Sequence, residues 1–242
     1  MWRILPEAAK SSSDPGGVAF VNALQQQVQE SVGTLLSLFP IQQALALTDS
    51  HGGKAITHHR LYTFIQNFNL PMDVIYTKPR KPVVILALPN GYLLGLASLA
   101  VATYYTAMPI NISSGAEQFS RDAMLTTVKS IMVLESDMVK LGLREPWVAA
   151  AGIDVLVVEE DLNSTFSVRR VGQPINRSGL RRLEPNSGED FALILLTSGT
   201  SGKKKVVPIS VFSLIIGTCC VIDSWGLGGE DTCINMMPLN HV

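Results

Sequence analysis

The amino-acid sequence predicts an α/β fold with a mostly parallel sheet and helices on both of its faces. First, short apolar runs alternate with segments of helical periodicity along most of the chain, which is the pattern of successive βαβ units. Second, the short runs are apolar at nearly every position, as expected for strands that are buried on both faces of a parallel sheet. The chain has 242 residues, of which 47% are hydrophobic and 16% charged, so it is long enough to bury a sizeable core.

The expected elements are assigned in chain order. The breaker cluster SSSDPGG makes residues 1–16 a flexible start. Apolar residues at helical spacing predict an amphipathic helix over residues 18–38, and the polar residues 161–190 are expected to be a loop or linker. Further strands are predicted at residues 83–88, 130–135, 154–159, 191–196 and 232–237. Further helices are predicted at residues 92–105, 116–129, 138–148 and 210–223.

One stretch requires a choice between a buried core segment and a membrane span. Residues 82–116 contain no charged side chain, and a long apolar stretch of this kind can cross a bilayer. Pro89-Asn90-Gly91 interrupts the stretch early, however, and Met108-Pro109 closes it. We therefore expect a buried strand, a turn and an apolar helix, with no membrane span. A membrane-associated protein anchored by this stretch stays as an alternative.

The charge and the cysteine content argue against several classes of protein. A net charge of -1 gives no reason to expect a nucleic-acid partner. The three cysteines, Cys219, Cys220 and Cys233, are too few and too clustered for a disulfide framework, and no Cys/His spacing predicts a zinc site. The N-terminus lacks the apolar stretch and cleavage site of a secretory signal. These features predict a reduced, cytoplasmic protein that holds no metal through its own side chains.

The stretch TSGTSGKKKVV, residues 197–207, has the composition of an anion site. Gly199 and Gly202 allow positive φ and close backbone approach, so that successive N–H groups can point into one concavity. The stretch also contains the hydroxyl groups of Thr197, Ser198, Thr200 and Ser201 and the ammonium groups of Lys203, Lys204 and Lys205. No neighbouring carboxylate in the sequence cancels the lysine charge, and the combination suits a polyphosphate. We expect the stretch to connect a strand to a helix, at the carboxyl end of the sheet where α/β proteins bind ligands.

Other interpretations of this stretch remain open on composition. The spacing does not fit a Walker A motif, because only two residues separate Gly199 from Gly202 and Lys203 is followed by another lysine. A solvated Ser/Gly turn followed by a lysine run is the plain structural alternative. A localisation signal or an RNA contact has less support, since no aromatic residues are interleaved with the lysines.

The same stretch resembles the phosphate-binding signature of the adenylate-forming superfamily, Thr-Ser-Gly-Thr-Thr/Ser-Gly-x-Pro-Lys-Gly. This superfamily includes acyl-CoA synthetases, nonribosomal-peptide adenylation domains and luciferases. Three more segments resemble motifs of the superfamily and occur in the same order. Residues 54–61 resemble its Leu-Thr-Tyr element, and residues 238–241 resemble its Pro-Leu-x-His motif. Residues 83–111 resemble its early segment, in which a strand, Pro-Asn, a helix and Pro-Leu-Asn follow one another. Two positions depart from the signature, because Lys204 replaces the usual proline and Val206 the usual glycine.

The resemblance implies an activity and a set of site residues. Members of the superfamily join a carboxylic acid to ATP, which gives an acyl-adenylate and pyrophosphate, and most then transfer the acyl group to the thiol of coenzyme A or of a carrier-protein phosphopantetheine. The residues expected to bind ATP are Thr197, Ser198, Gly199, Thr200, Ser201, Gly202, Lys203 and Lys205. Lys205 is expected to neutralise the leaving pyrophosphate, and His241 to lie near the α-phosphate and the substrate carboxylate. Mg²⁺ is expected to share the phosphate charge.

The resemblance also implies that residues 17–242 form an incomplete N-terminal domain, because part of the catalytic unit is absent from them. The superfamily's later adenine and ribose elements and its small C-terminal domain, which carries a second lysine, are not found before Val242. The 242 residues are therefore expected to be inactive alone. A non-catalytic phosphate-binding or interaction protein that retains only the loop is the alternative. His241 could also be a hydrogen-bonded packing residue.

Several other side chains are expected to have no chemical role. We expect surface or loop positions for His51, His58 and His59. We expect buried positions for Cys219, Cys220, Met236 and Met237.

Overall fold

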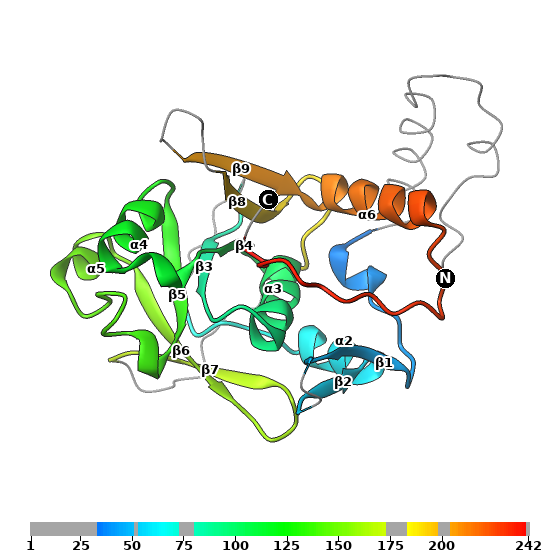
Figure 1. The fold of residues 1–242 in the computed structure, drawn as a ribbon. Coiled ribbons are helices and arrows are strands. Elements are labelled where there is room, and N and C mark those ends of the chain that lie inside the picture. The colour runs from blue at the N-terminus through cyan, green and yellow to red at the C-terminus, as the bar shows by residue number, and fades with distance from the viewer. Residues whose placement is uncertain (1–32, 51–52, 73–79, 173–182, 198–203, 241–242) are drawn as a thin grey trace.

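The computed structural model describes residues 33–50, 53–72, 80–172, 183–197 and 204–240. At its centre lies a seven-stranded sheet in the order β7-β6-β5-β3-β4-β8-β9 (Figure 1). The strands are β3 (Val83–Ala87), β4 (Thr106–Pro109), β5 (Val128–Leu134), β6 (Asp154–Glu160), β7 (Phe166–Arg170), β8 (Phe191–Thr197) and β9 (Lys205–Ser210). The five inner strands are parallel, and the edge strands β7 and β9 pair antiparallel with their neighbours. The predicted α/β fold with a mostly parallel sheet is confirmed.

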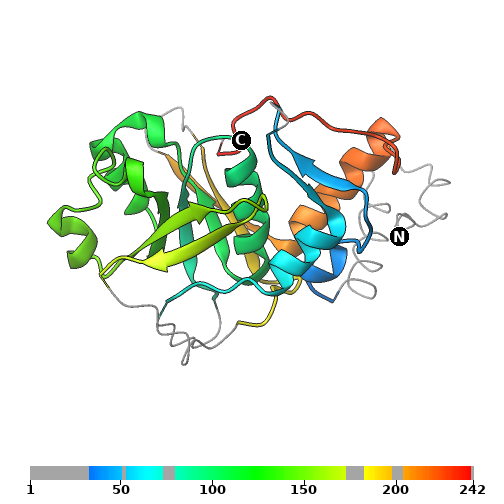
Figure 2. The same cartoon turned by 90° about the horizontal axis from the view of Figure 1, so that it is seen from below.

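Helices cover both faces of the sheet (Figure 2). One face carries α2 (His58–Gln66), α3 (Tyr92–Tyr104) and α6 (Val211–Trp225), and the other carries α4 (Ala116–Ala123) and α5 (Pro146–Ala150). Side chains of the central strands alternate between two hydrophobic clusters, as strand geometry requires. In β3, Val84 and Leu86 belong to the cluster under α2, α3 and α6, whereas Ile85 and Ala87 belong to the cluster under α4 and α5. We call these the first and the second core cluster.

A small antiparallel hairpin of β1 (Leu45–Thr48) and β2 (Ala55–Thr57) precedes α2. Thr57 caps α2, because its hydroxyl accepts a hydrogen bond from the Arg60 amide at 3.3 Å. Three 3₁₀ turns complete the described elements: η2 (Leu35–Leu38), η3 (Ile112–Ser114) and η4 (Glu135–Asp137). The helix predicted over residues 18–38 is wrong over residues 33–38, where the chain forms only η2. The rest of that prediction, like the flexible start at residues 1–16, lies outside the described residues.

Most of the remaining predicted elements lie where the apolar runs placed them. The strands predicted at residues 83–88, 130–135, 154–159 and 191–196 correspond to β3, β5, β6 and β8, and the helices predicted at residues 92–105 and 210–223 correspond to α3 and α6. The bounds differ by one or two residues.

Two predicted helices are wrong in their extent. The helix predicted over residues 116–129 ends at Ala123, because Val128 already pairs with Val83 in the sheet. The helix predicted over residues 138–148 is replaced by turns and the short α5. Gly142 adopts a left-handed φ of 65°, which ends any regular helix there, and Pro146 begins α5 as its first residue.

The polar stretch at residues 161–190 is not wholly a loop. Residues 166–170 form β7, which pairs antiparallel with β6 and extends the sheet. Phe166 is buried and packs edge-on against Phe64 of α2, with ring centroids 5.0 Å apart. This contact packs the hairpin of β6 and β7 against the helix layer. The sequence did not predict β7, because the residues on either side of Phe166 are polar. Residues 173–182 lie outside the described residues.

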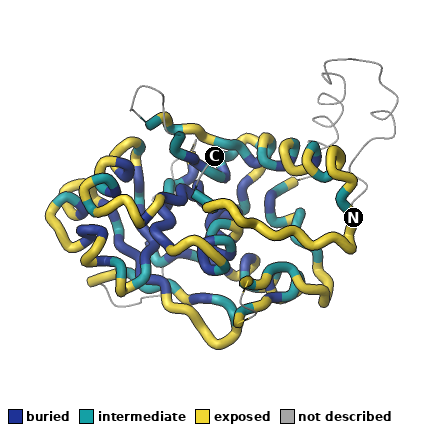
Figure 3. The backbone as a smooth tube through the Cα atoms, viewed as in Figure 1, coloured by how far each residue is buried: buried dark blue, intermediate teal, exposed yellow. Residues whose placement is uncertain are grey.

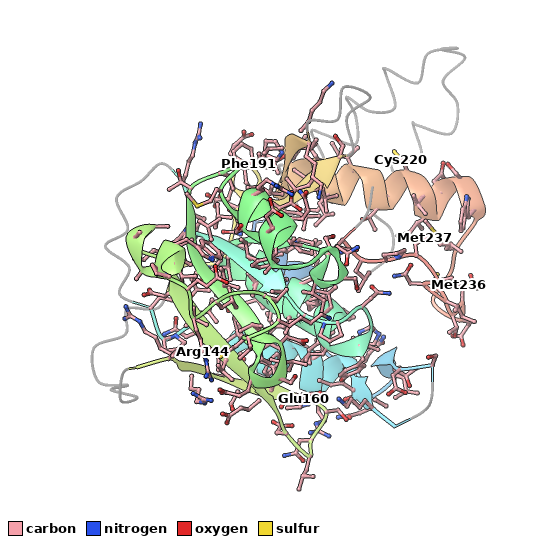
Figure 4. All side chains as sticks on the ribbon, turned by 60° about the vertical axis from the view of Figure 1, so that its left-hand side comes forward. Arg144, Glu160, Phe191, Cys220, Met236 and Met237 are labelled. Carbon is pink, nitrogen blue, oxygen red and sulfur yellow. The ribbon has the colours of Figure 1, made fainter. Side chains whose placement is uncertain are left out.

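The strand predicted at residues 232–237 is not formed. Residues 231–238 are exposed and extended (Figure 3), and no described strand lies alongside to pair with them. Met236 is 89% exposed and Met237 64% exposed (Figure 4), so the prediction that both belong to the core is wrong.

The structure also bears on the uncharged residues 82–116. Within the described parts of the chain, no helix combines the length and the apolar character needed to cross a membrane. The apolar stretch divides into β3, the 13-residue α3 and β4, and nearly all of α3 is covered by the first core cluster.

Candidate functional site

The candidate site lies at the carboxyl ends of β3, β4 and β8, which are neighbours in the sheet. Since these strands are parallel, their last residues meet at one edge. The chain leaves β3 through Pro89-Asn90, leaves β4 through Asn111 and leaves β8 at Thr197. Ligands of open α/β sheets bind in the crevice outside this edge.

The end of the chain returns to the same edge. Figure 1 shows the segment after α6 running back across the molecule toward β4 and the start of α3. There the backbone N–H of Leu239 donates a hydrogen bond of 2.9 Å to Oδ1 of Asn90, which is 149 residues earlier in the chain. The Leu239 side chain packs against the first core cluster. Residues 238–240 are thus held against the loop that follows β3.

Asn90 and Asn111 have different local functions. The Asn90 side chain accepts the long-range hydrogen bond from Leu239, whereas Oδ1 of Asn111 accepts a hydrogen bond from the Ser113 amide at 2.8 Å and caps η3. Asn111 therefore fixes the turn after β4, and Asn90 joins the two ends of the candidate site.

The phosphate-binding stretch begins and ends in adjacent strands. Thr197 is the last residue of β8 and Lys205 the first of β9, and the two face each other in the antiparallel pairing. The predicted site residues Ser198, Gly199, Thr200, Ser201, Gly202 and Lys203 lie outside the described residues, as does His241. The structure thus places the two flanking residues of the loop and brings them together.

The element after the loop is a strand, so the prediction that the loop leads directly into a helix is wrong. Helix α6 begins only at Val211, where the Ser210 hydroxyl accepts a hydrogen bond from the Ser213 amide at 3.1 Å. Strand β9 separates the two, and six strand residues span about 17 Å. The N-terminus of α6 therefore lies at the far end of β9 from Lys205.

One lysine of the run has a carboxylate partner, which corrects the expectation that the charge of this run is uncompensated. Nζ of Lys204 lies 2.5 Å from Oδ2 of Asp122 on α4. Asp122 is 2% exposed, and its other oxygen accepts a hydrogen bond of 2.7 Å from Nε2 of Gln118. The Lys204 charge is therefore matched by a buried negative charge 82 residues away in the sequence.

Lys205 and Val206 point to opposite faces of β9, because side chains alternate along a strand. Val206 pairs with Leu196, and both pack against the second core cluster. Lys205 is exposed. The Cβ that replaces the usual glycine of the signature is therefore directed into the second core cluster, away from the face that Lys205 occupies.

Asp122 is the residue of this region that sequence reasoning missed. A signal was present, since Phe119, Asp122 and Ala123 share one face of a helix at i, i+3 and i+4, and all three are buried. A carboxylate on an apolar helix face requires a cation or hydrogen-bond donors. The sequence alone does not indicate that Lys204 is that cation.

The other titratable and sulfur-bearing side chains agree in part with expectation. His58 is half-buried and His59 exposed at the start of α2, while His51 lies outside the described residues. Cys219 is buried, and its pKa is raised first by desolvation and then by the neighbouring Cys220. Cys220 is half-buried, and Cys233 is exposed. The described part of the chain contains no group of three potential metal-ligating side chains.

A separate pocket of about 640 Å³ lies near the edge strand β7, between α5 and the strands β6 and β7. Its charged lining residues are Glu135, Arg144, Glu145, Asp154, Arg169 and Arg170. The two predicted site residues that the structure describes, Thr197 and Lys205, do not line it. Two of its arginines are paired with its own carboxylates, Arg169 with Glu135 and Arg170 with Asp154.

Comparison with known proteins extends these observations. Residues 42–242 match the family model described as AMP-binding enzyme. Among curated proteins, the peroxisomal OPC-8:0-CoA ligase 1 of Arabidopsis thaliana is 26% identical over 222 residues, which cover 87% of this chain and 38% of the relative.

Solved structures share the fold. The crystal structure of apo MatB from Rhodopseudomonas palustris superposes with a TM-score of 0.60 at 17% identity, over 86% of this chain and 39% of that one. The o-succinylbenzoate CoA synthetase MenE from Bacillus subtilis, in complex with an acyl-adenylate intermediate, superposes with a TM-score of 0.57 at 14% identity, over 86% of this chain and 50% of that one. The chain thus spans half or less of the length of these relatives.

Proposed function

The chain belongs to the AMP-binding enzyme family, and from this premise we propose that it carries the ATP-binding part of a ligase that activates a carboxylic acid as an acyl-adenylate. In the second half of the reaction the acyl group passes to a thiol, that of coenzyme A or of a carrier-protein phosphopantetheine. The names of the relatives support this class of chemistry, since one is a CoA ligase and another was solved with an acyl-adenylate. MatB was also solved with ATP bound.

The observation that carries the proposal is the hydrogen bond between Leu239 and Asn90. It holds residues 238–240, which directly precede His241 in the sequence, at the sheet edge where β8 ends. An acyl-adenylate reaction needs its phosphate-binding donors and the group that orients the carboxylate on one side of one crevice. The position of residues 238–240 beside the loop that follows β3, in the same sheet as β8, supports this proposal.

We assign the roles as follows. The hydroxyls and backbone N–H groups of residues 197–202 would hold the β- and γ-phosphates, with Lys203 adding charge. Lys205 would neutralise the pyrophosphate as it leaves, since fixed positive groups at the developing charge are the effective form of such catalysis. His241 would orient the substrate carboxylate, whose oxygen attacks the α-phosphorus while the bond to pyrophosphate breaks.

Magnesium would bind this site together with the nucleotide. The described residues include no cluster of carboxylates that could form a metal cage. Mg²⁺ typically takes one or two protein carboxylates together with substrate phosphates and water. When bound with ATP, the ion would supply further charge neutralisation at the phosphates.

Calorimetric titration of the purified chain with ATP in the presence of Mg²⁺ tests the proposal. We expect saturable binding that Lys205→Met weakens at least about tenfold, because a direct charge contact to phosphate is lost. Arg121→Met is the matched control, since Arg121 is an exposed cation paired with Glu117 on α4. Absence of ATP binding at millimolar concentration, or equal binding by the Lys205→Met variant, would contradict the proposal.

ATP–pyrophosphate exchange tests the chemistry itself. We expect these 242 residues to bind ATP without exchange, because the adenine and ribose elements of the superfamily and its second lysine are not among them. Exchange by the purified chain would refute that expectation and strengthen the assignment of Lys205 and His241.

A further inference from the structure

The two described lysines at the end of the phosphate loop have different surroundings. Lys204 is bound to the buried Asp122 on α4 at 2.5 Å, while Lys205 is exposed on the neighbouring position of β9. We propose that Lys204 is a positioning residue that anchors the end of the loop to α4 and thereby directs Lys205 toward the phosphates, and that Lys204 itself does not bind ATP. This inference rests on the proposed function.

The burial of Asp122 is the first step of the argument. Asp122 is 2% exposed and lies on α4 between Phe119 and Ala123, which are fully buried. A carboxylate in such surroundings is strongly disfavoured unless a cation and hydrogen-bond donors compensate it. Both of its oxygens are satisfied, Oδ2 by Lys204 and Oδ1 by Gln118 at 2.7 Å. Lys204 is thus the cation that allows Asp122 to be buried.

The direction of the side chains is the second step. Lys204 reaches α4, and Val206 packs against the second core cluster that α4 covers, so these two residues lie on one side of the chain. Strand alternation places Lys205 on the other side. Holding Lys204 on α4 therefore fixes the rotation of the chain at the point where Lys205 leaves the loop. The pairing of Lys205 with Thr197 fixes its register.

Release of Lys204 to a phosphate would undo this arrangement. Lys204 would have to leave Asp122, and the buried carboxylate would then lack its cation. The proline that the family signature carries at this position fixes the backbone through its ring. In this chain the ion pair performs a comparable restraint through the side chain.

The experiment measures ATP affinity in the Asp122→Asn and Lys204→Met variants and in the double variant, by calorimetry with Mg²⁺ present. If Lys204 positions Lys205, both single variants bind ATP about five- to tenfold more weakly, and the double variant is no weaker than either single one. If Lys204 contacts phosphate directly, Lys204→Met weakens binding but Asp122→Asn strengthens it, because a negative charge is removed and a lysine is freed. Opposite signs of the two single effects would overturn the inference.

Two controls separate positioning from general loss of structure. Arg121→Met removes a cation from the same helix outside this pair, and we expect ATP binding to be unchanged. Lys204→Arg keeps the charge, and we expect it to bind ATP within about twofold of the unsubstituted chain. Weak binding by Arg121→Met, or full loss with Lys204→Arg, would contradict a specific role for the ion pair.

A second measurement needs no substitution. Lysine labelling with an amine-reactive reagent, followed by mass spectrometry, is compared with and without ATP. We expect ATP to protect Lys205 and to leave the slow labelling of Lys204 unchanged, and protection of Lys204 by ATP would overturn the inference. If the unsubstituted chain does not bind ATP, the proposed function fails first. If it binds ATP and the variants show opposite signs, only this inference fails.

Discussion

At the scale of single residues, a few polar side chains hold segments that are far apart in the sequence. Asn90 receives the Leu239 amide, Asp122 receives Lys204, and Tyr92 donates a 2.7 Å hydrogen bond to the Ser164 carbonyl. Each contact joins a strand-end loop or helix terminus to a segment more than 70 residues away. The candidate site depends on the first two.

The first residue-scale prediction concerns Asn90. Asn90→Leu removes the acceptor for the Leu239 amide, so we expect that amide to exchange its hydrogen with solvent faster, and global stability to fall by no more than about 1 kcal/mol because the bond is exposed. Site-resolved hydrogen exchange measures the first effect and urea unfolding the second.

Asn90→Asp is the control for that prediction. The carboxylate retains an acceptor oxygen in the same place, so the Leu239 amide should keep its protection at neutral pH. Fast exchange of Leu239 in the unsubstituted chain would show that residues 238–240 are not held by this contact.

The second residue-scale prediction concerns pH and Tyr92. Burial is the largest cause that raises its pKa to about 12, with Asp161 and Asp49 adding to the rise and Arg60 opposing it. The folded state therefore retains the phenol proton at a pH where the unfolded chain, with a pKa near 10, has lost it. The corresponding stability is fully present below pH 10 and is lost as the pH rises toward 12.

Urea unfolding between pH 9 and 12, compared with Tyr92→Phe, measures this dependence. We expect the unsubstituted chain to lose more stability across this interval than the variant, which has no phenol to titrate. Parallel pH profiles of the two proteins would show that Tyr92 titrates normally in the fold.

At the scale of elements, β7 illustrates how a strand can form in a polar stretch. Only one large apolar side chain in β7, Phe166, is fully buried, and it contacts Phe64 and Phe68 with ring centroids 5.0 and 5.9 Å away. The turn before it docks on the helix layer, because Arg60 donates to the Asn163 carbonyl at 2.8 Å. A single aromatic anchor, backbone pairing with β6 and hydrogen bonds from the helix layer to the turn thus place the hairpin.

Phe166→Ala tests this anchor. We expect the free energy of unfolding to fall by about 3 to 5 kcal/mol, because the substitution leaves a cavity beside the rings of Phe64 and Phe68. Leu162→Ala is the control on the same hairpin, since Leu162 is fully exposed, and it should change stability by less than about 0.5 kcal/mol. Comparable effects of the two substitutions, followed by urea unfolding, would contradict the assigned anchor.

At the scale of the whole molecule, the edge strands of the sheet and the segment after α6 differ in their tendency to associate with other molecules. The edge strands carry devices that discourage further pairing: Arg169 and Arg170 in β7, and Pro208 in β9. The segment after α6 instead exposes large apolar side chains. Those more than half exposed are Ile234, Met236 and Met237, and Trp225 at the end of α6 is more than half exposed as well. Exposed apolar side chains of this size promote association between molecules.

The molecule-scale prediction follows from that exposure. The double variant Ile234→Ser and Met236→Ser should raise the concentration at which the chain associates, with little change in the free energy of unfolding, because neither side chain is buried. Light scattering over a concentration series measures association and urea unfolding measures stability. A large loss of stability would mean that these side chains pack against the core.

The sequence by itself determined the α/β class, the positions of β3, α3, β5, β6, β8 and α6, and the family resemblance. These features depend on apolar periodicity and on local motifs, which are written in consecutive residues. Three segments were assigned wrongly for different reasons. Residues 138–148 contain Gly142 in a left-handed conformation. Residues 166–170 form a strand because they pair with β6, and residues 232–237 have no described strand to pair with.

Only the tertiary structure decided how the candidate site is held together. The sequence shows a carboxylate at Asp122, an amide at Asn90 and three successive lysines, but not that Lys204 is paired with Asp122 or that Leu239 is bound to Asn90. Those contacts bridge 82 and 149 residues. They exist because the parallel sheet brings the carboxyl ends of β3, β4 and β8 to one edge while α4 packs beside them. Such contacts between distant segments arise from the folded sheet, and no pattern in consecutive residues predicts them.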